Sequence, residues 1–174
     1  PWAGRICCIA WRIVDFDYDS GICYFISDIR ASGHGDEEGL MASFEASLLS
    51  IPRKQADKLT VAHFVGHNIK SFDIPFLYLR AAKYGLKSLQ QIIPSRGQLD
   101  RIEDTMELAC VTARMTPDKY VGLDKACKFF GIKGKGDIDG SKVYDYWKDG
   151  KHEEIAAYCK ADVERVIALH NVLK

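Results

Sequence analysis

Hydrophobic and polar positions change their spacing several times along the chain, and each change marks a predicted element. Apolar, β-prone runs bounded by turn residues predict strands at residues 5–14, 22–26, 59–65 and 102–108. Runs with helical periodicity, acidic first turns or closing glycines predict helices at residues 36–49, 71–84, 122–130, 141–148 and 152–173. The first two strands form a β-hairpin. Without repeats or a linker, we expect one α/β domain over residues 1–174.

Composition narrows the function classes only slightly. The 174 residues are enough to bury a core, and 47% hydrophobic with 28% charged residues is ordinary for a globular protein. Because 24 basic residues balance 24 acidic ones, any phosphate-binding face must be local. No apolar run approaches the ~18 residues of a membrane span, so no membrane association is expected. Six cysteines without a Cys-x2-Cys pair predict reduced thiols of a cytoplasmic protein and disfavour zinc.

The first candidate site is the polar turn that follows the strand predicted at 59–65. It has the form Asn-x3-Phe-Asp, from Asn68 to Asp73. Helix capping accounts for part of it, with Ser71 as N-cap and Asp73 near the positive helix end. Capping does not account for Asn68. Since ligand sites in open α/β sheets gather where strands end, a functional turn is the alternative.

The second candidate site has the form Tyr-x3-Asp, at Tyr158 and Asp162. Residues four apart on a helix share one face, so the hydroxyl and the carboxylate lie side by side. The carboxylate can bind a hard metal ion through oxygen, and the phenol can orient a water molecule. On spacing alone, an amphipathic helix with both side chains in solvent is the simpler explanation.

Together, the two segments resemble the second and third motifs of the DEDD superfamily of 3′-5′ exonucleases, which have the ribonuclease H-like fold. The tyrosine four residues before Asp162 matches the DEDDy branch, since the histidine branch would have its histidine at Ala157. More narrowly, the chain is similar to stand-alone bacterial and phage proteins related to the exonuclease domain of family-B DNA polymerases. The similar stretches are residues 66–77, 104–108 and 131–162. The resemblance implies a three-layer α/β/α domain with a mixed sheet.

The resemblance also implies phosphodiester hydrolysis with two Mg²⁺ or Mn²⁺ ions about 3.5–4 Å apart. By match of motif, Asp162 is a direct metal ligand, Asp73 holds the second ion and Tyr158 orients the attacking water. The implied activity is 3′-5′ exonuclease action on single-stranded DNA or unpaired 3′ ends, with release of nucleoside monophosphates. Two alternatives remain open: a non-catalytic nucleic-acid-binding or protein-binding module with a degenerate nuclease site, and an RNA-processing 3′-5′ exonuclease.

The resemblance and the local positive charges together predict the substrate contacts. Asn68 and Phe72 are expected to contact the terminal nucleotide, and stacking on an aromatic ring suits a nuclease that accepts any sequence. Lys70 and Arg80 flank the turn and are expected to steer a nucleic-acid end. The basic, glycine-rich segment 133–142 is either a solvated connector or a contact to the nucleic-acid backbone.

The first motif of the family, Asp-x-Glu on the first strand, has no counterpart before Arg5. The nearest candidate in form is Asp15-x-Asp17, but acids in a hairpin turn are usually solvated. We therefore expect the first strand to be missing from this chain and the chain itself to be weakly active or inactive. Other expectations are minor: His63 and His67 support the fold, and the three tryptophans pack inside it (Trp2, Trp11 and Trp147).

Overall fold

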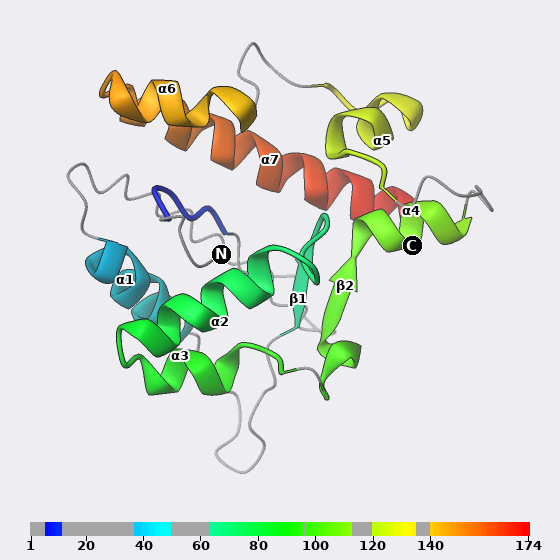
Figure 1. Cartoon of the computed structure of the whole chain (residues 1–174). Helices are drawn as coiled ribbons and strands as arrows, with labels where there is room; N and C mark the ends of the chain where they lie inside the picture. Colours follow the sequence, from blue (N-terminus) through cyan, green and yellow to red (C-terminus); the bar gives the residue numbers. More distant parts are fainter. Residues whose placement is uncertain (1–5, 12–36, 50–62, 96, 113–119, 135–139) are drawn as a thin grey trace, which may run out of the picture.

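The computed structural model describes residues 6–11, 37–49, 63–95, 97–112, 120–134 and 140–174 (Figure 1). The predicted strand 22–26, Asp15, Asp17 and Trp2 lie outside these residues. In chain order the elements are α1 (Glu37–Leu49), β1 (Phe64–Gly66), α2 (Asp73–Lys83), α3 (Lys87–Ile92), η1 (Leu99–Arg101), β2 (Ile102–Asp104), α4 (Thr105–Thr112), α5 (Leu123–Phe129), η2 (Gly140–Lys142), α6 (Val143–Lys148) and α7 (His152–Leu173).

The sheet of the described residues consists of two short parallel strands. Phe64 of β1 is opposite Ile102 of β2, and Gly66 is opposite Asp104. Parallel strands need a long crossover connection, which α2 and α3 supply here. Helices surround the strand pair (Figure 1). The chain is therefore a helix-rich α/β protein with a small sheet, and the carboxyl ends of both strands lie at the same edge.

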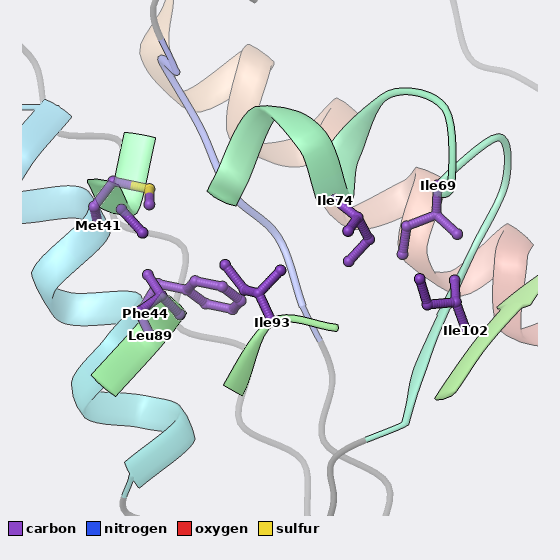
Figure 2. Close-up of a cluster of buried hydrophobic side chains, with 8 residues drawn as sticks. Met41, Phe44, Ile69, Ile74, Leu89, Ile93 and Ile102 are labelled. Atoms are coloured by element: carbon purple, nitrogen blue, oxygen red, sulfur yellow. The ribbon is translucent and has the colours of Figure 1, made fainter. Parts of the chain in front are cut away.

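One hydrophobic cluster joins α1, α2, α3, β2 and the turn after β1 (Figure 2). Its buried members are Met41, Phe44, Ile69, Ile74, Ala81, Leu89, Ile93 and Ile102. Full burial of one Ile, Leu or Phe side chain contributes about 1.5–3 kcal/mol, so this cluster accounts for much of the local stability. Trp11 packs edge-on against Phe44, with ring centroids 5.0 Å apart, as expected for a core tryptophan.

A buried acid, Glu37, ties three segments together beside this cluster. Its carboxylate accepts hydrogen bonds from the Ile6 amide at 2.7 Å and the Tyr84 hydroxyl at 2.6 Å. Arg80 Nε lies 3.1 Å from the same carboxylate. Burial alone would raise the pKa of Glu37, but the Tyr84 hydroxyl, the Ile6 amide and the Arg80 charge outweigh it and lower that pKa. Glu37 therefore fixes residues 6–11 and α2 against α1.

Several predicted boundaries need correction. Residues 6–11 run as an irregular segment, not as the predicted strand. The strand predicted at 102–108 ends at Asp104, because the Asp104 side chain accepts the Met106 amide and starts α4 as an N-cap does. The short helix α3 was not predicted. The helices at 37–49 and 152–173 are confirmed almost to the residue.

Glycine closes two of the helices as predicted. Gly85 follows α2 with φ +67° and Gly131 follows α5 with φ +68°, a backbone conformation that side chains with Cβ rarely adopt. The long helix α7 runs past the strand pair, and α6 lies along its first half (Figure 1). Among the helices of the described ranges, none is both long and apolar enough to cross a membrane.

Candidate functional site

The turn after β1 is a defined structure built around Asn68. This residue has φ +59°, in the left-handed region that asparagine enters more readily than most residues with a side chain. Its carbonyl accepts the Phe72 amide at 3.1 Å, and the Ile69 carbonyl accepts the Ile74 amide at 3.0 Å. The left-handed backbone conformation of this turn thus accounts for an asparagine at position 68. The predicted Ser71 cap is wrong, because α2 begins at Asp73 with Phe72 in the cap position and no side-chain cap hydrogen bond.

Close packing at the base of the turn requires glycine. A Cβ atom added to Gly66 would lie 2.7 Å from Cβ and Cδ1 of Ile69, far inside van der Waals contact. Ile69 is buried and belongs to the hydrophobic cluster, so it has little room to move. Because Ile69 is anchored in the core and Gly66 has no side chain, the polar residues of the turn can fold back over the end of β1.

Asp104 organises the turn from the neighbouring strand. It is 2% exposed, and its carboxylate accepts three backbone amides: Asn68 at 2.8 Å, Lys70 at 3.2 Å and Met106 at 3.0 Å. Such charge-assisted bonds make burial of the carboxylate tolerable. Sequence reasoning assigned no role to Asp104. The predicted strand runs on to residue 108, so Asp104 does not stand out in the sequence as an acid at a strand end.

His67 joins the turn to two further segments. Its Nδ1 is 3.0 Å from the Thr105 hydroxyl, and its Nε2 is 2.6 Å from the Val121 carbonyl. Because a carbonyl only accepts, Nε2 carries a proton. Desolvation lowers the pKa of His67, against the opposing influence of the Val121 carbonyl and the Asp104 charge. His67 has the supporting position expected of it.

Asp73 is exposed at the first turn of α2 and lacks an ion-pair partner in the described part of the chain. Desolvation by the surrounding protein raises the pKa of Asp73 to about 6; its own backbone amide lowers it, and the negative charge of Asp104 adds to the rise. A carboxylate without a neighbouring positive charge attracts a cation. This is the property required of a metal ligand.

Asp162 has a different environment on α7. It is half-buried and forms an ion pair with Arg165, which is 7% exposed and also lies 3.9 Å from Asp124. The charge of Asp162 is thus already compensated inside the protein. Sequence reasoning missed Arg165, although acid and arginine three apart on a helix are a recognisable pair.

Tyr158, one turn before Asp162, is half-buried and lies under the start of η2. A Cβ atom added to Gly140 would be 3.4 Å from its hydroxyl oxygen. Gly140, in the basic segment 133–142, therefore lies next to the candidate site.

The structure brings the two sequence motifs into one neighbourhood. Cys159, between Tyr158 and Asp162, has its pKa raised by a hydrogen bond to Cys8, by burial, and by the nearby negative charge of Asp73. Helix α7 also contacts β1 and passes its carboxyl end (Figure 1). Asp73 and the Tyr158–Asp162 segment thus lie within electrostatic reach of each other at the same edge of the sheet.

The residues expected to contact substrate fall into two groups. Phe72 is available, with 59% of its surface exposed and its ring 5.9 Å from that of Phe76. Lys70 is engaged, since its Nζ lies 2.6 Å from Glu107. Arg80 corrects our expectation, because it is 7% exposed, paired with Glu37, and therefore a structural residue.

A complete metal site does not arise from these residues. Within the described ranges, no group of three or more His, Cys, Asp or Glu side chains is placed to hold an ion. Asp73 suits a cation, but Asp162 is paired with Arg165 and Asp104 is occupied by three amides. The described part of the chain therefore supplies only a part of the ligand set that a two-metal nuclease needs.

Comparison with known proteins identifies the family of this chain. A family model described as "predicted 3'-5' exonuclease related to the exonuclease domain of PolB" matches residues 36–169. A DNA polymerase of Archaeoglobus fulgidus is 24% identical over 142 residues, which span 77% of this chain and 18% of the polymerase. No solved structure matches. The family match covers most of the chain and both motifs, and the chain therefore belongs to the family of predicted 3′-5′ exonucleases related to the exonuclease domain of PolB.

Proposed function

We propose that this chain is a metal-dependent 3′-5′ exonuclease domain of the DEDDy type with a ribonuclease H-like three-layer fold. It would remove nucleoside monophosphates from the 3′ ends of single-stranded DNA. One observation supports the proposal: Asp73, a carboxylate without an ion-pair partner among the described residues, acts electrostatically on Cys159 of the Tyr158–Asp162 segment, close to the end of β1. Ligand sites of α/β proteins gather at that edge, and the family match names the reaction.

In this proposal Asp73 and Asp162 hold Mg²⁺ or Mn²⁺, both of which accept oxygen ligands. Two such ions, when bound, stabilise the attacking and leaving oxygens of the phosphodiester. Asp162 leaves Arg165 when it takes up a cation, because one carboxylate cannot serve both fully. Tyr158 orients the attacking water through its hydroxyl.

The terminal nucleotide would lie against the turn. Phe72 offers an exposed ring for the last base, Asn68 supports it, and Lys70 approaches the phosphate by leaving Glu107. We also propose a cytoplasmic location, in keeping with the free thiols of Cys7, Cys8, Cys110, Cys127 and Cys159.

Substitution of either candidate ligand tests the catalytic assignment. Asp162→Ala and Asp73→Ala should each abolish Mn²⁺-dependent shortening of a 5′-labelled single-stranded oligonucleotide. Asp100→Ala, which alters an exposed acid of η1, is the matched control and should keep wild-type activity. DNA and RNA of the same sequence, single-stranded and duplex, define the preferred substrate. Activity retained by Asp162→Ala would refute the assignment.

A second candidate function is a nucleic-acid-binding module without catalysis. The observation in its favour is the ion pair between Asp162 and Arg165, which compensates a proposed metal ligand within the protein. This candidate predicts binding of single-stranded DNA that is independent of Mn²⁺, with no shortening of the oligonucleotide. Release of nucleoside monophosphates by the wild-type protein but not by Asp162→Ala would exclude it.

A further inference from the structure

Helix α6 carries a pair of stacked aromatic rings on the surface. Tyr144 is 69% exposed and Trp147 is 39% exposed. Their ring centroids are 6.4 Å apart, with 26° between the ring planes. We expected Trp147 to pack in the core, but α6 has no buried residue. Two exposed, stacked aromatic rings need another explanation.

The position of α6 relates this pair to the candidate nuclease site. The helix packs along α7, which carries Tyr158 and Asp162 (Figure 1). The short turn η2 leads directly into α6, and Gly140 at its start approaches the Tyr158 hydroxyl. A chain lying across the aromatic pair can therefore continue toward Tyr158 over one short segment of protein.

Positive charge flanks the aromatic pair. Lys142 at the end of η2 and Lys148 at the end of α6 are both exposed, and neither has an ion-pair partner in the described part of the chain. Lys148 shares the helix face of Tyr144, since it lies four positions after it. Of the acids nearby, Asp149 is paired with Lys151 at 3.5 Å, and Asp145 is exposed on α6.

We propose that Tyr144 and Trp147, with Lys142 and Lys148, form a binding site for the single-stranded nucleic acid that leads to the cleaved 3′ end. Bases stack on the two rings and backbone phosphates contact the two amines. Stacking of this kind accepts any base, and flanking lysines supply the charge complementarity that a phosphate backbone requires. The choice of ligand rests on the proposed nuclease function; the site itself binds without catalysis.

Binding without metal tests the aromatic pair. Fluorescence anisotropy of a labelled oligothymidylate in EDTA should show that the double variant Tyr144→Ala/Trp147→Ala binds about tenfold or more weakly, since each stacked base contributes substantially. Tyr144→Phe/Trp147→Phe keeps the rings and should bind like the wild type. Phe129→Ala removes a ring of α5 that is 76% exposed, and it should leave binding unchanged.

Salt dependence tests the two lysines separately. Lys142→Gln/Lys148→Gln should reduce the slope of log Kd against log salt concentration by about 1.4, because each phosphate contact to a single strand contributes about 0.7. The matched control, Lys87→Gln/Lys125→Gln, removes two other exposed lysines and should keep the wild-type slope. An unchanged slope in the Lys142/Lys148 variant would overturn the assignment of phosphate contacts.

A small substrate separates this inference from the proposed function. The p-nitrophenyl ester of thymidine 5′-monophosphate has no chain to reach α6, so Tyr144→Ala/Trp147→Ala should hydrolyse it like the wild type. Wild-type oligonucleotide binding by that variant overturns the inference even if hydrolysis is intact. Loss of binding in a protein that never hydrolyses the ester supports the α6 site and refutes the nuclease.

Two further measurements keep the test decisive. If the double alanine variant loses cooperative unfolding, Trp147→Leu replaces it, because leucine keeps apolar bulk and removes only the ring. Sedimentation of the wild type and the variant detects a competing use of the pair as a contact between two copies of the chain. A change in mass with unchanged oligonucleotide binding overturns the inference in favour of self-association.

Discussion

The two acidic segments of the candidate site differ in how the protein compensates their charge. Around the turn after β1, Asp104 accepts three backbone amides and is fully engaged, whereas Asp73 has a raised pKa and no cation partner among the described residues. On α7, Asp162 is paired with the buried Arg165. Asp73 in the first segment can therefore bind a cation directly, whereas Asp162 in the second segment must release Arg165 before it binds one.

Strand β2 shows how one short element serves both regions. Glu103 and Asp104 are adjacent, and side chains of successive strand residues point to opposite faces. Glu103 contacts His170 at 2.6 Å and Lys174 at 3.0 Å, at the end of α7. Asp104 holds the turn. The same strand thus positions the turn through buried, charge-assisted bonds and anchors α7 through a partly exposed ion pair.

The largest expected effect comes from Asp104→Asn. Asparagine lacks the charge and one acceptor oxygen, so the partly buried amides of Asn68 and Lys70 lose charge-assisted bonds, at a cost of about 3 kcal/mol in the free energy of unfolding. Urea denaturation measures the loss, and amide hydrogen exchange should show faster exchange at the turn than in α7. Asp100→Asn, an exposed acid, is the control. A loss no larger than that of the control would contradict the role given to Asp104.

Acid-to-amide substitutions should have opposite signs in the two regions. The pKa of Asp73 rises from 3.8 to about 6 on folding, so its ionised form opposes folding as the pH rises through that window. Asp73→Asn should therefore stabilise the protein at pH 7 and have less effect at pH 4. Asp162→Asn leaves Arg165 with its longer contact to Asp124 and should cost about 1 kcal/mol at pH 7, a value reduced by solvent screening. If urea denaturation at pH 7 shows that both variants are stabilised or both are destabilised, the two acids do not differ as described.

A smaller effect is expected from the partner of Asp162. Arg165→Gln removes the positive charge that competes with a metal ion, so the Mn²⁺ concentration for half-saturation should fall about fivefold, on the order of 1 kcal/mol for a partly exposed pair. Calorimetric titration with Mn²⁺ measures this change. Lys128→Gln is the control, because Lys128 pairs with Asp124 on the surface nearby. Unchanged or weaker Mn²⁺ binding in Arg165→Gln would show that Arg165 and the metal ion do not compete for Asp162.

The smallest effect is expected at Glu103, the neighbour of Asp104. Hydrogen bonds from His170 and then Lys174 lower the pKa of Glu103. The stabilisation is therefore present above the ordinary glutamate pKa and is lost as the pH falls below it. Glu103→Gln should cost about 0.5 kcal/mol at pH 7 and almost nothing near pH 3, since the pair is partly exposed. Glu38→Gln, at an exposed position of α1, is the control for these denaturation curves.

Local signals were sufficient for most helices. The helices at 37–49 and 152–173 follow from periodicity and acidic first turns, and Gly85 and Gly131 mark helix ends. Local signals failed where a distant partner decides the structure. The end of β2 depends on the Asp104 side chain, and the shape of the turn depends on the same carboxylate 36 residues from Asn68. Trp147 is exposed on a helix that packs along α7 but has no buried residue, which its apolar character alone does not predict.

The sequence by itself determined the order and spacing of the two motifs, and hence the family, because both motifs are short and local. Only the tertiary structure decided how their charges are compensated. Asp73 and Asp162 are the same residue type, but desolvation and the nearby Asp104 charge raise the pKa of Asp73, while Arg165 compensates the charge of Asp162. Such differences depend on which groups lie within a few ångströms, and parallel pairing and helix packing bring those groups together from distant parts of the chain.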